Sequence, residues 1–151
     1  DMVRLGLVVY GTSRNIKIAN ELTPVITWSS QIVQIKMVKK GESIGYGRSF
    51  KANEDMQIAI IPVGYADGYR RSLGNGKGHV YLNGKGFSTI GNICMDMIII
   101  DVTESVVEEG DLVEIIGPNQ SLLNFSELLD TIPYEVLTSL SNRVHRNYII
   151  N

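Results

Sequence analysis

The sequence is poor in cysteine and in long apolar runs, and each scarcity excludes a class of protein. The single cysteine, Cys94, permits no internal disulfide and no cysteine-based zinc site. This pattern fits a reducing compartment, so we expect a cytoplasmic protein. The longest apolar runs fall far short of the roughly 18 to 20 residues that a membrane-spanning helix requires. We therefore expect a soluble chain without a membrane segment.

Histidine is also scarce, which argues against hydrolytic chemistry. The two histidines, His79 and His145, have no neighbours that suggest a nucleophile and a carboxylate partner. The glycine-rich stretch at residues 74–78 lacks the lysine-serine ending and the helix of a phosphate-binding loop. We interpret that stretch as a solvated turn, and a catalytic triad is not expected.

Positive charge is not concentrated anywhere in the chain. The formal net charge is −2, and lysines cluster only lightly at Lys36, Lys39 and Lys40, so nucleic acid is not an expected partner. Asp67 and Asp96 have no second acidic or histidine ligand at a recognisable spacing, which predicts no metal site. Asp67 reads more simply as a turn residue.

The sequence does contain many strand-like segments, punctuated by fifteen glycines. Residues 24–38 alternate between apolar and polar side chains, which predicts one long half-buried strand. Residues 79–90 predict a hairpin, because Asn83-Gly84 supplies the positive φ angles of a tight primed turn. Further strands are expected at residues 56–63, 95–103, 111–117 and 143–150.

Two short helices are expected after residue 117. Asn124 with Glu127 three positions later has the pattern of a capping box, and Pro133 fits a first helical turn. Many short strands with two appended helices predict a mainly β fold, closed into a barrel-like domain or packed as a sandwich.

Two tyrosines each follow a glycine directly, at Gly45-Tyr46 and Gly64-Tyr65. By composition alone, a tyrosine at the end of a strand is most often a packing residue. A phenol has an ordinary pKa near 10, so it serves as a base near neutrality only where cations or hydrogen-bond donors lower that value. The residues by themselves leave packing and catalysis both open.

Five motifs in order carry a family resemblance: "RLGLVVYG", "SIGYGRSF", "IPVGYADGY", "GNICMDM" and "IPYEV" followed by "NRVHR". With them the chain resembles the C-terminal domain of the alanine racemase family, fold-type III pyridoxal-phosphate enzymes with an N-terminal (β/α)8 barrel. The resemblance implies that residues 1–11 are the truncated last strand of that barrel and its exit. Residues 12–151 are then the β-barrel-like C-terminal domain. The cofactor implied is pyridoxal 5'-phosphate, whose Schiff-base lysine lies in the absent barrel.

The resemblance also implies roles for residues that face the substrate. Tyr46 resembles the acid/base that works on the face of the α-carbon opposite the cofactor lysine, since racemisation needs one proton-transfer group on each face. Tyr65 resembles the tyrosine that narrows the substrate entrance. Met95 matches the residue whose backbone amide binds the substrate carboxylate.

Four other residues match the family's cofactor-binding positions. Arg4 resembles the arginine that hydrogen-bonds the pyridine nitrogen and keeps it unprotonated. Gly6 and Leu7 match backbone amides that hold the cofactor phosphate, and Tyr134 matches a tyrosine that contacts the phosphate at the entrance.

The function implied is interconversion of L- and D-alanine for peptidoglycan precursors, by a head-to-tail homodimer. In that dimer Tyr46, Tyr65 and Met95 serve the partner's cofactor. A bulky Tyr134 favours alanine over serine. Three departures from the motifs of many relatives are Asn92, Met97 and His145. The alternatives are a serine or broad-specificity racemase of this family, or a non-catalytic β-barrel module for binding or dimerisation.

Overall fold

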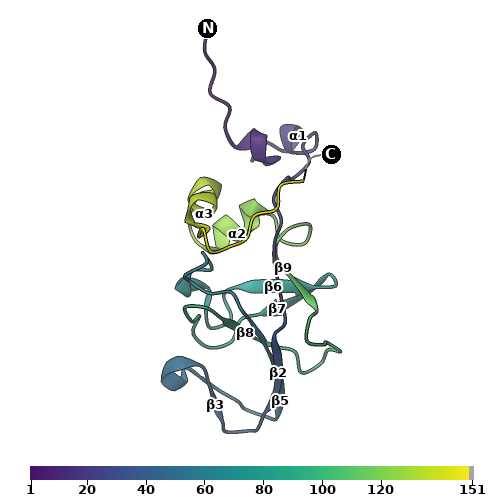
Figure 1. Ribbon diagram of the computed structural model, residues 1–151, viewed down its shortest axis with the longest axis vertical. Helices are drawn as coiled ribbons and strands as arrows, with labels where there is room; N and C mark the ends of the chain where they lie inside the picture. The colour runs from purple at the N-terminus through teal and green to yellow at the C-terminus, as the bar shows by residue number, and fades with distance from the viewer. Residues whose placement is uncertain (150–151) are drawn as a thin grey trace.

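Antiparallel sheets make up most of the chain in the computed structural model, which describes residues 1–149. The sheets have the strand orders β1-β9-β6-β7, β2-β5-β8 and β3-β4. Most of these strands are labelled in Figure 1. The strands are β1 (Trp28–Gln31), β2 (Gln34–Val38), β3 (Ser43–Ile44), β4 (Phe50–Lys51), β5 (Met56–Ile61), β6 (His79–Leu82), β7 (Lys85–Ser88), β8 (Ile98–Asp101) and β9 (Leu112–Ile116). The prediction of a mainly β fold is confirmed.

The single long strand expected at residues 24–38 is wrong, because the chain changes sheets in the middle of it. β1 pairs with β9, whereas β2 pairs with β5. The change occurs at Ile32 and Val33: the Ile32 amide donates to the carbonyl of Asp111 (3.0 Å) and the Val33 amide donates to that of Ile60 (2.9 Å). Two successive backbone amides therefore bond toward two different sheets, and the chain passes from one sheet to the other without an intervening loop.

The hairpin expected at residues 79–90 is present as β6 and β7. Val80 faces Phe87 across the pair, and Asn83 and Gly84 have φ angles of 48° and 81°. Positive φ at both central residues is the conformation of a type I′ turn, as the Asn-Gly pair predicted. The strands expected at residues 56–63, 95–103 and 111–117 are present as β5, β8 and β9.

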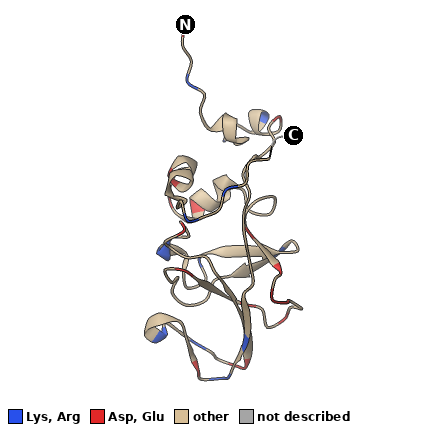
Figure 2. Cartoon of the chain, viewed as in Figure 1, with Lys and Arg blue, Asp and Glu red and all other residues tan. Residues whose placement is uncertain are grey.

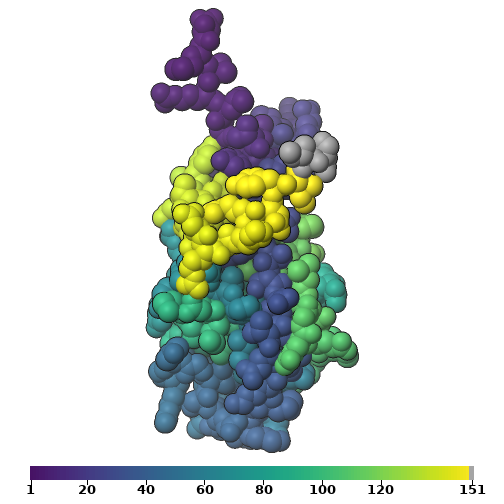
Figure 3. Space-filling model, in the orientation of Figure 1, coloured from purple at the N-terminus to yellow at the C-terminus, as the bar shows by residue number. Residues whose placement is uncertain are grey.

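Neither end of the chain forms a strand within the described residues, and the strand expected at residues 143–150 is wrong for residues 143–149. Residues 1–6 have no regular structure, and η1 (Leu7–Tyr10) is a 3-10 helix, followed by the short α1 (Ile16–Ala19). No neighbouring strand in residues 1–149 pairs with this segment, and it projects from the body (Figure 3). At the other end, residues 143–149 form no strand, and the Arg146 guanidinium donates to the Leu140 carbonyl (3.0 Å). Ile150 lies outside the described residues.

Two helices cover one end of the sheets, α2 (Leu122–Leu128) and α3 (Pro133–Ser139) (Figure 1). Pro133 opens α3, as expected. The predicted N-cap of α2 is wrong by three residues: the hydroxyl of Ser121 caps the helix by accepting from the amide of Asn124 (3.1 Å). Within residues 1–149, no helix is long and apolar enough to cross a membrane.

Three aromatic rings connect these helices to the sheets. Trp28, Tyr69 and Phe125 lie with ring centroids 5.8–6.3 Å apart in tilted and edge-to-face arrangements. All three are buried, and burial raises the pKa of Tyr69 well above its ordinary value. Tyr69 is therefore a core residue, and it anchors the loop that also carries Tyr65.

Charged residues of both signs are interspersed along the chain (Figure 2). The electrostatics of this chain are therefore described by individual ion pairs rather than by a patch of one sign. Three pairs lie outside the core, joining Lys39 to Asp55, Arg70 to Glu135, and Arg143 to Asp96. The last two pairs lie beside candidate site residues.

Candidate active site

Tyr46 sits at the tip of a narrow turn between β3 and β4. The turn is the 3-10 segment η2 (Tyr46–Arg48), and Gly45 and Gly47 on either side of Tyr46 have φ angles of 74° and 70°. A glycine adopts this left-handed conformation without the steric penalty of a side chain. Tyr46 is 73% exposed, so it adds little to the core and the packing interpretation is wrong for this residue.

Tyr65 and Met95 lie on two loops that touch through their backbones. The Tyr65 amide donates to the carbonyl of Cys94 (3.0 Å), and the Ala66 amide donates to that of Met95 (3.1 Å). A Cβ atom on Gly64 would lie 2.3 Å from the Met95 carbonyl oxygen, so only glycine permits this contact. Tyr65 and Met95 are 47% and 51% exposed, and both side chains are accessible at this contact.

Arg143 connects these loops to the C-terminal segment. Its guanidinium donates to Asp96 (2.6 Å) and lies 3.5 Å from the buried Asp67, which also accepts from the Gly64 amide (2.9 Å). The hydrogen bond to Asp96, with the charge of Asp67 beside it, raises the pKa of Arg143 above its ordinary value. The turn role expected for Asp67 is confirmed, but the partnership with Arg143 was missed.

Asn92 brings Tyr46 next to the Met95 loop. Its side-chain amide donates to the carbonyl of Tyr46 (3.1 Å), and its backbone amide donates to the hydroxyl of Ser49 (3.1 Å). Through these bonds the turn that holds Tyr46 is fixed to the loop that holds Met95, which in turn contacts Tyr65. The three residues with expected substrate-facing roles therefore belong to one surface region.

Gly6 and Tyr134 form a second group. A Cβ atom on Gly6 would lie 2.8 Å from the Tyr134 hydroxyl, so the two residues are in direct proximity. Leu7, the next residue, packs against the main core. Arg4 is exposed and makes no hydrogen bond or ion pair within residues 1–149. Three of the four residues with expected cofactor roles therefore converge, and Arg4 precedes them on the projecting segment.

The start of α3, which carries Tyr134, is held in place by the side chain of the next residue, Glu135. Glu135 accepts hydrogen bonds from the Thr131 hydroxyl and from the Arg70 guanidinium. These bonds, that of Thr131 first, hold the pKa of Glu135 below its ordinary value. The start of α3 is thereby connected to the segment after Tyr69, and Tyr134 remains 41% exposed.

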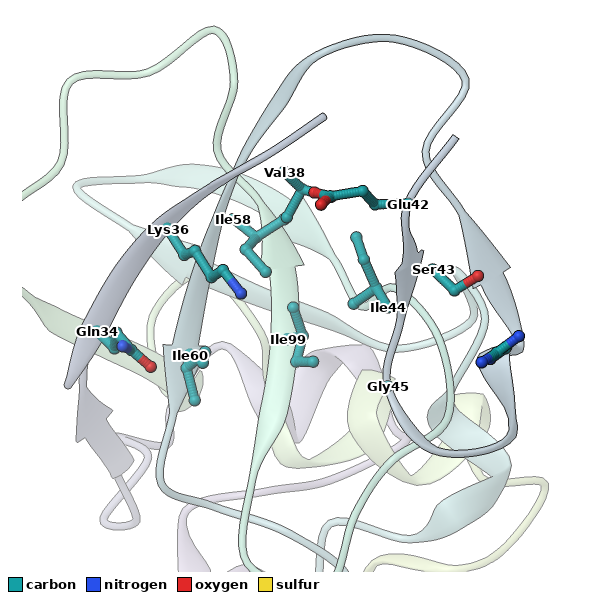
Figure 4. A pocket seen from close by; sticks show the side chains of 11 residues that line it. Gln34, Lys36, Val38, Glu42, Ser43, Ile44, Gly45, Ile58, Ile60 and Ile99 are labelled. Atoms are coloured by element: carbon teal, nitrogen blue, oxygen red, sulfur yellow. The ribbon is translucent and has the colours of Figure 1, made fainter. Parts of the chain in front are cut away.

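The Tyr46 turn and the helix that carries Tyr134 occupy different parts of the molecule. α3 lies toward the end that carries both termini, whereas the turn beside β3 lies toward the opposite end (Figure 1). Beside that turn is a hollow of about 600 Å³, with Ile58, Ile60 and Ile99 on the sheet and Gly45 across from them (Figure 4). The Tyr65 loop lies between the Tyr46 turn and α3, because the Ser141 amide, just after α3, donates to the carbonyl of Asp67 (3.2 Å).

The family model described as the alanine racemase C-terminal domain matches residues 25–148. The chain belongs to the alanine racemase family. Alanine racemase of Brucella canis is 41% identical over 165 residues, which cover 99% of this chain and 41% of that protein.

Solved alanine racemases share the fold. The Bartonella henselae enzyme, with covalently bound pyridoxal phosphate, superposes with a TM-score of 0.87 at 38% identity, covering 95% of this chain and 40% of that one. The Bacillus anthracis enzyme with bound L-Ala-P gives a TM-score of 0.82 at 31% identity, covering 92% of this chain and 37% of that one. The chain thus spans about two-fifths of the length of these alanine racemases.

Proposed function

We propose that this chain is the C-terminal part of a pyridoxal-phosphate-dependent racemase that interconverts L- and D-alanine. One observation carries the proposal: the Tyr46 turn, the Tyr65 loop and the Met95 loop are joined by hydrogen bonds while all three side chains remain exposed. Residues that contribute little to packing but are held in place in this way suit a role toward a bound molecule.

The second group fits the phosphate of the cofactor. η1 begins at Leu7, and the first amides of a helical turn have no partner within the turn. The Tyr134 hydroxyl next to Gly6 adds a further donor. Arg4, with no partner among residues 1–149, offers a guanidinium to the pyridine nitrogen. When bound, pyridoxal phosphate acidifies the α-hydrogen of the amino acid.

The three substrate-facing residues have different roles: proton transfer, binding of the substrate carboxylate and narrowing of the entrance. The Tyr46 phenol oxygen takes the α-proton from one face of the substrate or returns it there, and the cofactor lysine outside this chain serves the other face. The Met95 amide donates to no acceptor within residues 1–149 and is available to the substrate carboxylate. Tyr65 narrows the entrance beside it.

The Tyr46 turn and α3 lie toward opposite ends of the molecule, which supports a site shared between subunits. In a head-to-tail homodimer, Arg4, Gly6, Leu7 and Tyr134 serve their own cofactor, and Tyr46, Tyr65 and Met95 serve that of the partner. A two-fold axis generates two such sites. The bulk of Tyr134 at the entrance favours alanine over serine, and the D-alanine produced supplies peptidoglycan precursors in the cytoplasm.

The test is Tyr46→Phe in the complete protein, meaning residues 1–151 together with whatever else its reading frame encodes. Loss of one hydroxyl preserves most of the side-chain volume but removes the proton-transfer group, so turnover should fall by a factor on the order of 100 or more. Cofactor absorbance should persist. Tyr65→Phe should be milder and act mainly on KM. Near-normal turnover of Tyr46→Phe in both directions would refute this role.

A further inference from the structure

The turn that carries Tyr46 has little intrinsic rigidity. Gly45 and Gly47 flank the tyrosine, and Arg48 also has a positive φ of 50°. On one side, Gly45 and Arg48 line the hollow above the β2-β5-β8 sheet, so packing from that side is sparse (Figure 4). Because glycine gives a backbone the most freedom to move, a turn of this kind holds its shape only if something ties it down.

Asn92 supplies that restraint. Its Nδ2 donates to the Tyr46 carbonyl (3.1 Å), and its backbone N–H donates to the Ser49 hydroxyl (3.1 Å), so it holds both ends of the turn. A carbonyl only accepts hydrogen bonds, which fixes the orientation of the Asn92 amide: the nitrogen faces Tyr46 and the oxygen faces away. The Asn92 oxygen is thereby placed to accept a hydrogen bond on the other side of the residue.

Asn75 is that donor. Its Nδ2 lies 3.2 Å from Oδ1 of Asn92, and its backbone amide donates to the carbonyl of Gly91 (2.8 Å). Asn75 has a φ of 56°, a conformation that asparagine tolerates better than most residues. The loop after η3 (Arg71–Leu73) is thus attached to the Asn92 loop twice, and the hydrogen bonds run from Asn75 through Asn92 to Tyr46.

We propose that Asn92, supported by Asn75, is a positioning residue that sets where the Tyr46 phenol stands. The inference rests on the proposed role of Tyr46. Asn92 touches no substrate in this scheme and acts through the Tyr46 backbone. Proton transfer requires the acid/base within hydrogen-bond reach of the reacting carbon, so loosening of the turn should slow that step and leave cofactor binding intact.

The decisive variant is Asn92→Asp in the complete protein with its cofactor. It is nearly isosteric and keeps an oxygen toward Asn75, but it replaces the donor that faces Tyr46 by an acceptor. Loss of the hydrogen bond from Asn92 to the Tyr46 carbonyl should lower kcat roughly five- to tenfold, with a smaller change in KM. Asn75→Gly should lower kcat by about two- to threefold, because glycine keeps the left-handed conformation and removes the side chain that supports Asn92.

Two readouts separate positioning from general damage. Hydrogen–deuterium exchange of the peptide spanning residues 44–50 should speed up in Asn92→Asp, which needs no activity to measure. The α-deuterium isotope effect on kcat should rise for only one alanine enantiomer, since Tyr46 removes the proton from one face. Asn53→Asp, an exposed position on the turn before β5, adds the same charge and should leave both readouts at wild-type values.

The possible outcomes are distinct. The proposal is overturned if Asn92→Asp has wild-type kcat and unchanged hydrogen–deuterium exchange. It is also overturned if Asn92→Asp lowers kcat by the same factor in the Tyr46→Phe background as in the wild type. A residue that acts through the Tyr46 hydroxyl should have no further effect once that hydroxyl is gone. If Asn92→Asp fails to fold, unchanged exchange and kcat in Asn75→Gly overturn it instead. An active Tyr46→Phe enzyme rejects the role of Tyr46, whereas the exchange experiment still decides whether Asn92 holds the turn.

Discussion

A Cβ atom on Gly64 would lie 2.3 Å from the carbonyl oxygen of Met95. Real Cβ atoms do not approach a backbone oxygen so closely, so the loop of Tyr65 and the loop of Met95 are in contact only because residue 64 has no side chain. The glycine before Tyr65 thus serves the meeting of two loops, whereas the glycine before Tyr46 serves a left-handed turn.

Gly64→Ala should therefore separate the two loops. The methyl group meets backbone rather than a flexible side chain, so we expect a loss of about 1–3 kcal/mol in the free energy of unfolding and a fall in turnover. Denaturant unfolding and steady-state assays of the complete protein measure both. Gly86→Ala, at a position without a positive φ where the Cβ atom meets only the Tyr81 side chain (3.2 Å), is the control. A Gly64→Ala protein no less stable than that control would contradict the close approach.

The chain of residues 1–151 produced alone should not racemise alanine. The cofactor lysine is expected outside it, and the projecting segment with Arg4 has no surroundings to complete a cofactor pocket. Circular dichroism should still show β structure, because the aromatic cluster and all three sheets lie within this chain. Formation of D-alanine by the purified chain with added pyridoxal phosphate would contradict this expectation.

Subunit exchange tests whether Tyr46 acts on the partner's cofactor. Two inactive variants of the complete protein are mixed, one without the cofactor lysine and one with Tyr46→Phe. Each mixed dimer then has one intact site, and random exchange makes about half of the dimers mixed, so roughly a quarter of wild-type activity should return. Mixtures that exchange subunits, as shown by mass spectrometry, and stay inactive would refute a shared site.

The anchoring of α3 should weaken in acid. Because its hydrogen bonds lower the pKa of Glu135 in the folded state, the stability they add is fully present above the ordinary value of 4.5 and is lost as the pH falls through the lowered value. Glu135→Gln should lower the melting temperature at neutral pH, and the difference from wild type should vanish in acid. Glu127→Gln on α2 is the control, and equal behaviour of the two variants would count against this anchor.

Local signals predicted local structure well. The Asn83-Gly84 pair specified its turn because both residues determine φ by themselves. The N-cap of α2 was misplaced because Asn124 and Ser121 are both good caps, and the choice depends on where the helix packs. The break at Ile32 and Val33 does leave a signal in the sequence: two consecutive apolar residues shift the apolar positions by one, at the point where the pairing partner changes.

The candidate site was predictable only in part. The ordered motifs named Tyr46, Tyr65, Met95 and Tyr134, and the structure shows how the first three are linked. Arg143 and Asn92 act through contacts with residues 47 and 46 positions away, which no local pattern reveals. The signal for both lay inside "NRVHR" and "GNICMDM", where Asn92 was interpreted only as a departure flanking the matched residues.

The pairing of β1 with β9 also determines when this domain can finish folding. During synthesis β2, β5 and β8 leave the ribosome before β9, so their sheet has all its strands while β1 still lacks its partner. Trp28 in β1 stays uncovered until β9 and the Phe125 helix emerge at the far end of the chain. Long loop closure of this kind makes folding slow and leaves apolar surface open to aggregation. A nascent chain stalled before β9 should therefore be a chaperone client, whereas one released after α3 should not.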